Sequence, residues 1–140
     1  MPLFHWSKQF AVYLPEIDAE HRAIFVAAAE LERAVAARSP QARVREIVRA
    51  VIAHTEDHFT HEERLMRAAR YDAFEWHKTQ HDGVRRRLKE FAKRMDSADR
   101  TAPGELLEYL AHWLHDHTQL TDRMMGARLR NFYREQRRAS

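Results

Sequence analysis

The sequence predicts an all-α protein: an antiparallel up-down-up-down four-helix bundle with an extended N-terminal arm and a short C-terminal helix. Its 140 residues include only three Gly and four Pro, whereas Ala, Arg, Leu and Glu are frequent, and this composition favours helices. Apolar residues recur every three or four positions through four long segments. The segments are joined by short connections, which favour antiparallel neighbours in a bundle. The length is that of one domain spanning residues 1–140.

The first half of the chain is expected to hold the arm and two helices. Residues 1–17 contain two prolines and no sustained period, which is typical of an extended arm. A helix is expected over residues 18–38, with Asp18 as its N-cap. A Ser-Pro pair then predicts the start of a second helix over residues 40–69. The inward stripes of these helices are Ile17, Ile24, Ala28, Leu31 and Val35, and then Val44, Ile47, Val48 and Val51.

Two further helices and a basic tail are expected in the second half. The third helix should cover residues 72–95, and the stretch DSADRTAPG that follows is the clearest loop. The fourth should run from about residue 105 to the late 120s. The inward residues of the two are Phe74, Val84, Leu88, Phe91 and Met95, and then Leu107, Leu110, Leu114 and Met124. The tail ARLRNFYREQRRAS reads as a solvated terminal helix, so no nucleic-acid partner is expected.

The composition excludes several classes of protein. No apolar run approaches the roughly 18 residues that a membrane span requires, and the N-terminus lacks a signal-peptide core. The absence of Cys excludes disulfides and thiolate metal sites, and a cytoplasmic location is expected. The net charge is only +3. Ten histidines are a clear excess and the one functional signal in the composition.

Polar residues interrupt the apolar stripes near one end of the bundle. They lie at the start of the first and third helices and near the end of the second and fourth, which are neighbouring places in an antiparallel bundle. These residues are His21, His58, Glu62, His77, His81 and His117. Buried imidazoles cannot easily satisfy one another, and unpaired buried polar groups are costly. A metal ion resolves this problem, because neutral imidazole and carboxylate are both metal ligands.

At these residues the sequence resembles the hemerythrin family, and most closely its single-domain bacterial members. The matching segments are IDAEHRAIF, HFTHEERLM, HKTQH and HWLHDHTQLTD. The resemblance implies two non-haem iron ions (Fe2+/Fe3+) with a bridging oxygen and O2 as ligand. One iron would take His77, His81 and His117, the other His21 and His58, and Glu62 and Asp122 would bridge them. Asp122 rests mainly on the resemblance, because five residues from His117 correspond to about 140° around an α-helix.

Such a ligand set would leave a single open position, on the iron with two histidines, which suits end-on binding of a small molecule. The resemblance implies reversible O2 binding for transport, storage or delivery, without enzymatic turnover. The alternatives are O2 or redox sensing, and a small enzyme that handles peroxide or nitric oxide. Zinc-protease chemistry is unsupported, because HEERL lacks the second histidine of H-E-x-x-H, and no Glu-x-x-His pair of a ferritin-like enzyme occurs. An O2-consuming protein partner is possible, and the oligomeric state stays open.

The O2 pocket is expected beside His117, lined by Trp113, Leu114 and Thr118. Family members usually carry Ile where this chain has Thr118. One hypothesis is that the Thr118 hydroxyl admits solvent to the pocket and shortens the life of the O2-bound protein. The alternative is that the hydroxyl bonds the carbonyl of Leu114, one turn back. Of the remaining polar residues near the ligands, Glu63, His61, His112 and His115 are expected on the surface, and His54 at the core or its rim.

Overall fold

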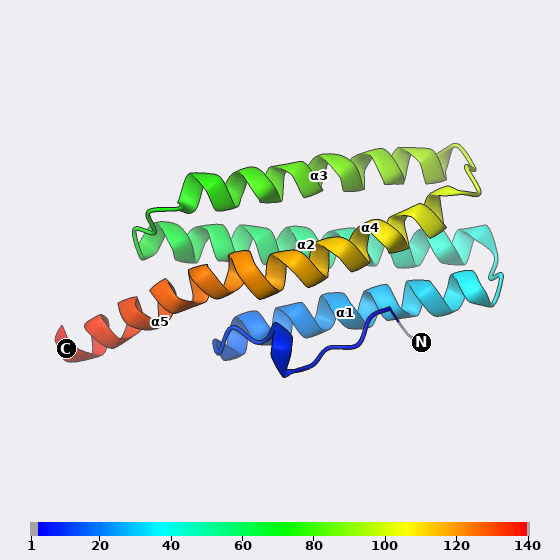
Figure 1. The fold of residues 1–140 in the computed structure, drawn as a ribbon. Coiled ribbons are helices and arrows are strands. Elements are labelled where there is room, and N and C mark those ends of the chain that lie inside the picture. The colour runs from blue at the N-terminus through cyan, green and yellow to red at the C-terminus, as the bar shows by residue number, and fades with distance from the viewer. Residues whose placement is uncertain (1–2, 140) are drawn as a thin grey trace.

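The computed structural model describes residues 3–139, and it confirms the predicted four-helix bundle (Figure 1). The four long helices lie side by side with short connections between them. The elements are η1 (Lys8–Phe10), α1 (Pro15–Ala36), α2 (Gln41–Ala68), α3 (Phe74–Asp96), α4 (Ala102–Asp116), the π-helical turn η2 (His117–Thr121) and α5 (Asp122–Ala139). Within residues 3–139 no helix is both long and apolar enough to cross a lipid bilayer.

The fourth helix and the expected C-terminal helix form one continuous rod. Helix α5 follows η2 without a loop, and its last turns extend past the end of the bundle (Figure 1). The sequence predicts a fourth helix that ends in the late 120s, with Met124 on its inner stripe, and a separate short helix after it, whereas α5 runs through that position without a break and the apolar stripe changes phase earlier, at η2. The π-helical turn accounts for that change of phase, since its hydrogen bonds close over one additional residue.

The N-terminal arm is held by polar contacts at its junction with the bundle. Helix α1 begins at Pro15, three residues earlier than expected, because proline is well suited to a first helical position. Asp18 therefore does not cap the helix. Its carboxylate instead accepts hydrogen bonds from the backbone N–H of Val12 at 2.8 Å and of Tyr13 at 3.2 Å.

Helix α5 forms the other side of this junction. Arg123 donates to the carbonyl of Gln9 at 2.6 Å, and Arg130 donates to the carbonyl of Val12. Gly126 permits the close approach, because a Cβ atom there would lie 3.0 Å from Val12 Cβ and 3.1 Å from its carbonyl oxygen. The arm is therefore fixed between the first turn of α1 and α5.

The apolar core is divided into two clusters. The larger cluster contains residues such as Leu31, Val48, Leu88 and Leu106, toward the ends where α1 joins α2 and α3 joins α4. The smaller cluster lies at the opposite end of the bundle and contains Val12, Leu14, Ile17, Met66, Ala69, Met125 and Leu129. Along each helix the polar residues of the predicted site fall between the members of the two clusters, except that on α2 His58 comes just before Phe59 of the larger cluster. A polar layer therefore crosses an otherwise apolar core.

The α3–α4 connection supplies a prediction about acid stability. Asp99 accepts hydrogen bonds from Thr101 N–H at 2.9 Å and Thr101 Oγ1 at 2.7 Å, and Arg94 Nε donates to it at 2.9 Å. These bonds, those of Thr101 first, lower the pKa of Asp99 to about 2. A depressed carboxyl pKa contributes stability above the unfolded value of about 4, and that contribution is lost as the pH falls toward 2. We expect Asp99→Asn to lower the melting temperature at pH 7, and the difference from wild type to shrink between pH 4 and 2. Asp96→Asn, the same chemical change at the exposed last residue of α3, is the control and should leave the melting temperature at pH 7 close to that of the wild type.

Candidate metal centre

The structure brings all seven predicted ligands into one buried layer. Their side chains are at most 4% exposed, and they come from all four helical rods of the bundle. Two overlapping groups have potential ligand atoms within 4.8 Å of one another: Glu62, His77, His81, His117 and Asp122 form the first, and His21, His58, Glu62 and Asp122 form the second. These groups match the division of the ligands that the resemblance implies. Glu62 and Asp122 belong to both.

The two carboxylates lie between the two histidine groups, and each carboxylate directs one of its oxygens toward one group and the other oxygen toward the other group. Glu62 Oε2 is 3.3 Å from His58 Nε2, whereas Glu62 Oε1 is 3.1 Å from His81 Nε2. Asp122 Oδ2 is 3.0 Å from His21 Nε2, whereas Asp122 Oδ1 is 3.0 Å from His117 Nε2. This is the arrangement required of a carboxylate that bridges two metal ions.

The π-helical turn brings Asp122 to the centre. The backbone N–H of Asp122 bonds the carbonyl of His117, five residues earlier, so the turn from His117 to Asp122 is wider than an α-helical one. Both side chains consequently lie on the same face, and Asp122 does not have to reach sideways. The same turn moves Met124 out to 47% exposure and buries Met125 completely. The prediction that Met124 faces the core was therefore wrong by one residue.

Three residues outside the predicted set hold the imidazole rings. Glu20 accepts from His58 Nδ1 at 2.6 Å, and Glu63 accepts from His81 Nδ1 at 2.8 Å. Since a carboxylate can only accept, these bonds fix the tautomers with Nε2 facing the centre. Gln80 Oε1 lies 3.2 Å from His117 Nδ1 and also accepts from Thr121 Oγ1 at 3.0 Å, which ties α3 to the π-helical turn.

The expectations for the flanking polar residues need correction. Glu63 is buried rather than on the surface, and Arg85 Nη1 donates at 2.8 Å to Glu63 Oε2, the same oxygen that accepts from His81. His61 is only partly exposed, and its Nδ1 lies 2.5 Å from Glu20. His54 is exposed, because the buried stripe of α2 passes from Val51 to Thr55. A search for acids adjacent to the ligands would have identified Glu20 and Glu63, since metal-binding histidines usually donate their other N–H to such groups.

The unsatisfied atoms of the layer have the composition of a metal-ligand set. The Nε2 atoms of all five histidines and all four oxygens of Glu62 and Asp122 are buried without a hydrogen-bond partner among residues 3–139. Burial of so many unpaired polar atoms is costly, and a cation relieves that cost by accepting lone pairs from each. The donors are nitrogen and oxygen atoms only, which suits iron and other borderline transition metals.

The charges of the layer agree with cation binding. Burial acts to raise the pKa of both carboxyls, but the surrounding imidazoles hold the pKa of Glu62 and of Asp122 well below the usual range. Burial acts to lower the pKa of His58 and of His77, yet the same carboxylates and Glu20 raise the pKa of His58 to about 10, and Asp122 and Glu62 raise that of His77 to about 9. Two ionised carboxylates are thus available, and a cation entering the layer would displace protons from the imidazoles.

The three residues expected to line an O2 pocket lie around His117. The centroid of the Trp113 ring lies 5.4 Å from that of His117 and 5.3 Å from that of Phe59. These contacts place Trp113 beside the group of three histidines that contains His117. The open position expected from ligand counting falls on the other side, so this contact does not support Trp113 as a neighbour of O2. Leu114 and Thr118 are both buried, and the Thr118 hydroxyl donates to the carbonyl of Leu114. This bond corresponds to the second of the two hypotheses for Thr118, in which the hydroxyl bonds the Leu114 carbonyl instead of admitting solvent to the pocket.

Family models, related sequences and solved structures all match this chain to the same family of proteins. Residues 13–129 match the family described as "Hemerythrin HHE cation binding domain". The chain is 33% identical to a bacteriohemerythrin of Ralstonia nicotianae, over 89% of this chain and 88% of that protein, and 31% identical to one of Stenotrophomonas maltophilia, over 96% and 90%. A crystal structure of a hemerythrin variant superposes with a TM-score of 0.80 at 21% identity, covering 92% of this chain and 98% of the other. With the fold, the buried layer and these relatives in agreement, the chain belongs to the hemerythrin family.

Proposed function

We propose that the protein, as a single domain over residues 1–140, holds two non-haem iron ions and binds O2 reversibly. His77, His81 and His117 would bind one iron, and His21 and His58 the other. Glu62 and Asp122 would bridge the two. The observation that carries the proposal is the position of these two carboxylates, each with one oxygen toward the pair of histidines and the other toward the three.

A di-iron centre of this kind supplies the electrons for reversible O2 binding when it is bound. The protein contributes ring orientation through Glu20, Glu63 and Gln80. It contributes exclusion of water through the apolar clusters on both sides of the layer. Five neutral imidazoles against two carboxylates are a ligand set poor in anions, which favours binding of O2 over oxidation of a substrate. We therefore propose a carrier or store without enzymatic turnover. The cytoplasmic location and an O2-consuming partner remain predictions.

Metal analysis and absorption spectroscopy test the proposal together. The purified protein should contain about two irons per chain, in line with a seven-ligand set. The reduced protein should develop a visible band in air and lose it under nitrogen through repeated cycles. One zinc per chain without iron would contradict the metal assignment. Consumption of many equivalents of peroxide or nitric oxide per protein, with a reductant supplied and without a reversible response to O2, would instead favour the enzymatic alternative.

Thr118 gives a prediction about how long the O2-bound protein lasts. Its hydroxyl hydrogen is already used by the Leu114 carbonyl, so the hydroxyl cannot also donate a hydrogen bond to a ligand. We expect Thr118→Val, which keeps the shape and removes the hydroxyl, to leave the half-life of the reversible O2-dependent band unchanged at constant pH. Thr118→Ile serves as the comparison for added volume. A clearly longer half-life in the Val variant would restore the hypothesis that the hydroxyl admits solvent.

A further inference from the structure

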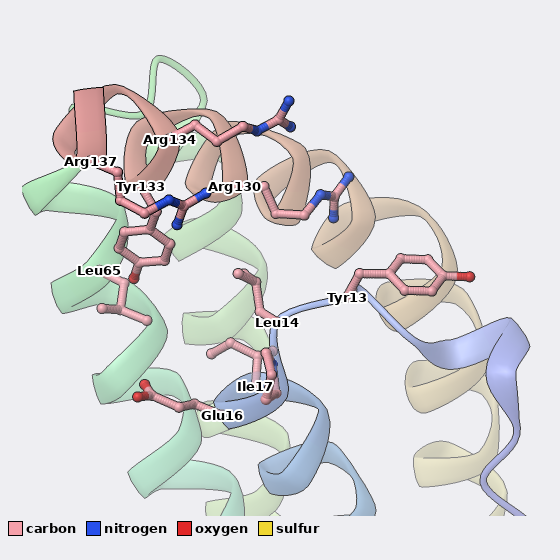
Figure 2. Close-up of a pocket in the computed structure, with 10 residues that line it drawn as sticks. Tyr13, Leu14, Glu16, Ile17, Leu65, Arg130, Tyr133, Arg134 and Arg137 are labelled. Atoms are coloured by element: carbon pink, nitrogen blue, oxygen red, sulfur yellow. The ribbon is translucent and has the colours of Figure 1, made fainter.

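A cavity of about 470 Å³ lies where α5 extends beyond the bundle (Figure 2). Its floor is apolar and is formed by Leu14, Ile17 and Leu65, from the end of the arm, the first turn of α1 and the last turns of α2. Ile17 and Leu65 lie about one turn from the predicted ligands His21 and Glu62, so the cavity is close to the metal layer but separate from it. Its volume is in the range of sites for small organic molecules.

The opposite wall of the cavity is cationic. Arg130, Tyr133, Arg134 and Arg137 line it from α5, at spacings that place them on one face of the helix (Figure 2). The only acid among the lining residues is Glu16, on the far rim and 77% exposed. Three guanidinium groups against one carboxylate leave the cavity with a net charge of +2.

We propose that this cavity binds a single-chain amphipathic anion, an alkyl carboxylate of medium length. The apolar floor would bury the alkyl chain, and the arginines of α5 would bind the carboxylate at the mouth. Guanidinium groups pair with carboxylates through two parallel hydrogen bonds, which makes arginine more specific for this head group than lysine. An uncharged alcohol of the same length would fill the floor but offer the cationic wall no negative charge.

The cationic side chains are placed to act at the mouth in different ways. Arg130 is anchored by the Val12 carbonyl and lies over the Tyr13 ring at 5.9 Å, so it gives a fixed positive charge. Arg134 is exposed and points away from the floor in Figure 2, and its long side chain can fold over a bound head group. Burial and the charge of Glu16 raise the pKa of Tyr133, which keeps its phenol neutral and able to donate a hydrogen bond.

The test is calorimetric titration of the full-length protein, as purified, with decanoate, octanoate, decanol and decyltrimethylammonium. Decanoate should bind saturably at one site per chain, decanol should bind at least about tenfold more weakly because only its alkyl chain is accommodated, and the cationic analogue should not bind. Octanoate should bind about tenfold more weakly than decanoate, because two fewer methylenes are buried. Failure of decanoate to bind, or equal binding of decanol, would overturn the proposal.

Variants locate the site. Arg134→Glu and Arg137→Glu should each weaken decanoate binding about tenfold or more. Leu65→Trp should block binding by filling the floor. Arg138→Glu makes the same change of charge outside the cavity and should leave binding intact, and melting temperatures confirm that each variant is folded. Equal binding by all the variants would contradict this location.

A lipid surface is the other source of anionic head groups attached to alkyl chains. Phosphatidylglycerol vesicles provide the corresponding arm of the experiment, measured by co-sedimentation. Binding to these vesicles without binding to monomeric decanoate would show that the basic face of α5 adsorbs to a membrane, and it would overturn the cavity proposal. Because none of these readouts depends on O2, the result is independent of the proposed function.

Discussion

Replacing Glu62 by Gln is expected to empty the metal centre of iron. The amide nitrogen cannot act as a ligand in place of the second carboxylate oxygen, so a bridge between the two histidine groups is no longer possible. The change also leaves buried imidazoles facing an amide, and loss of one partner from a buried charged network costs about 3 kcal/mol or more, which corresponds to a fall in melting temperature of roughly 10 °C. Iron per chain, the visible spectrum and the melting temperature measure the effect.

The neighbouring residue supplies a matched control. Glu63→Gln is the same chemical change one position along α2, at a residue that accepts a hydrogen bond from His81 Nδ1 but does not face the centre. The amide oxygen of Gln can still accept this bond, so we expect Glu63→Gln to retain about two irons. If Glu62→Gln also retained its full iron content and native spectrum, Glu62 would not be a ligand.

The sequence pattern was sufficient to predict the bundle and to select six of the seven proposed ligands, whereas Asp122 rested mainly on the family resemblance. Each helix carries its polar residues on an apolar stripe, and antiparallel packing puts those positions at one end. His58 and Glu62 on α2 show the reason. Residues four apart in an α-helix lie on the same face and one turn apart along the axis, so the sequence spacing places both side chains once the buried face is known. Where the helices are regular, as around His77 and His81, the spacing alone predicts convergence.

The remaining features depend on interactions that spacing does not encode. The π-helical turn from His117 to Thr121 changes the phase of all that follows, so Met125 rather than Met124 is buried. No residue type specifies such a turn, which is stabilised by what the shifted residues contact. The role of Asp18 is similar, because its partners are the backbone N–H groups of an arm whose path cannot be read from its own sequence.

Single-residue deletions in the rod formed by α4, η2 and α5 test how the π-helical turn places Asp122. Leu120 lies within the turn and is 61% exposed. Without it, His117 and Asp122 would be four residues apart, which in an ordinary α-helix puts them within about 40° of each other. We therefore expect the protein lacking Leu120 to become α-helical at this point, keep both side chains in the layer and retain about two irons.

The same deletion placed one turn earlier should have the opposite result. His115 is also exposed, and its removal rotates His117 by about 100° relative to the residues that precede it in α4. If the additional residue of the π-helical turn is absorbed, Asp122 returns to its original phase, but His117 leaves the layer. We expect this protein to remain helical by circular dichroism and to lose iron. Equal iron content in the two deletion variants would show that the phase of His117 relative to α4 does not determine metal binding.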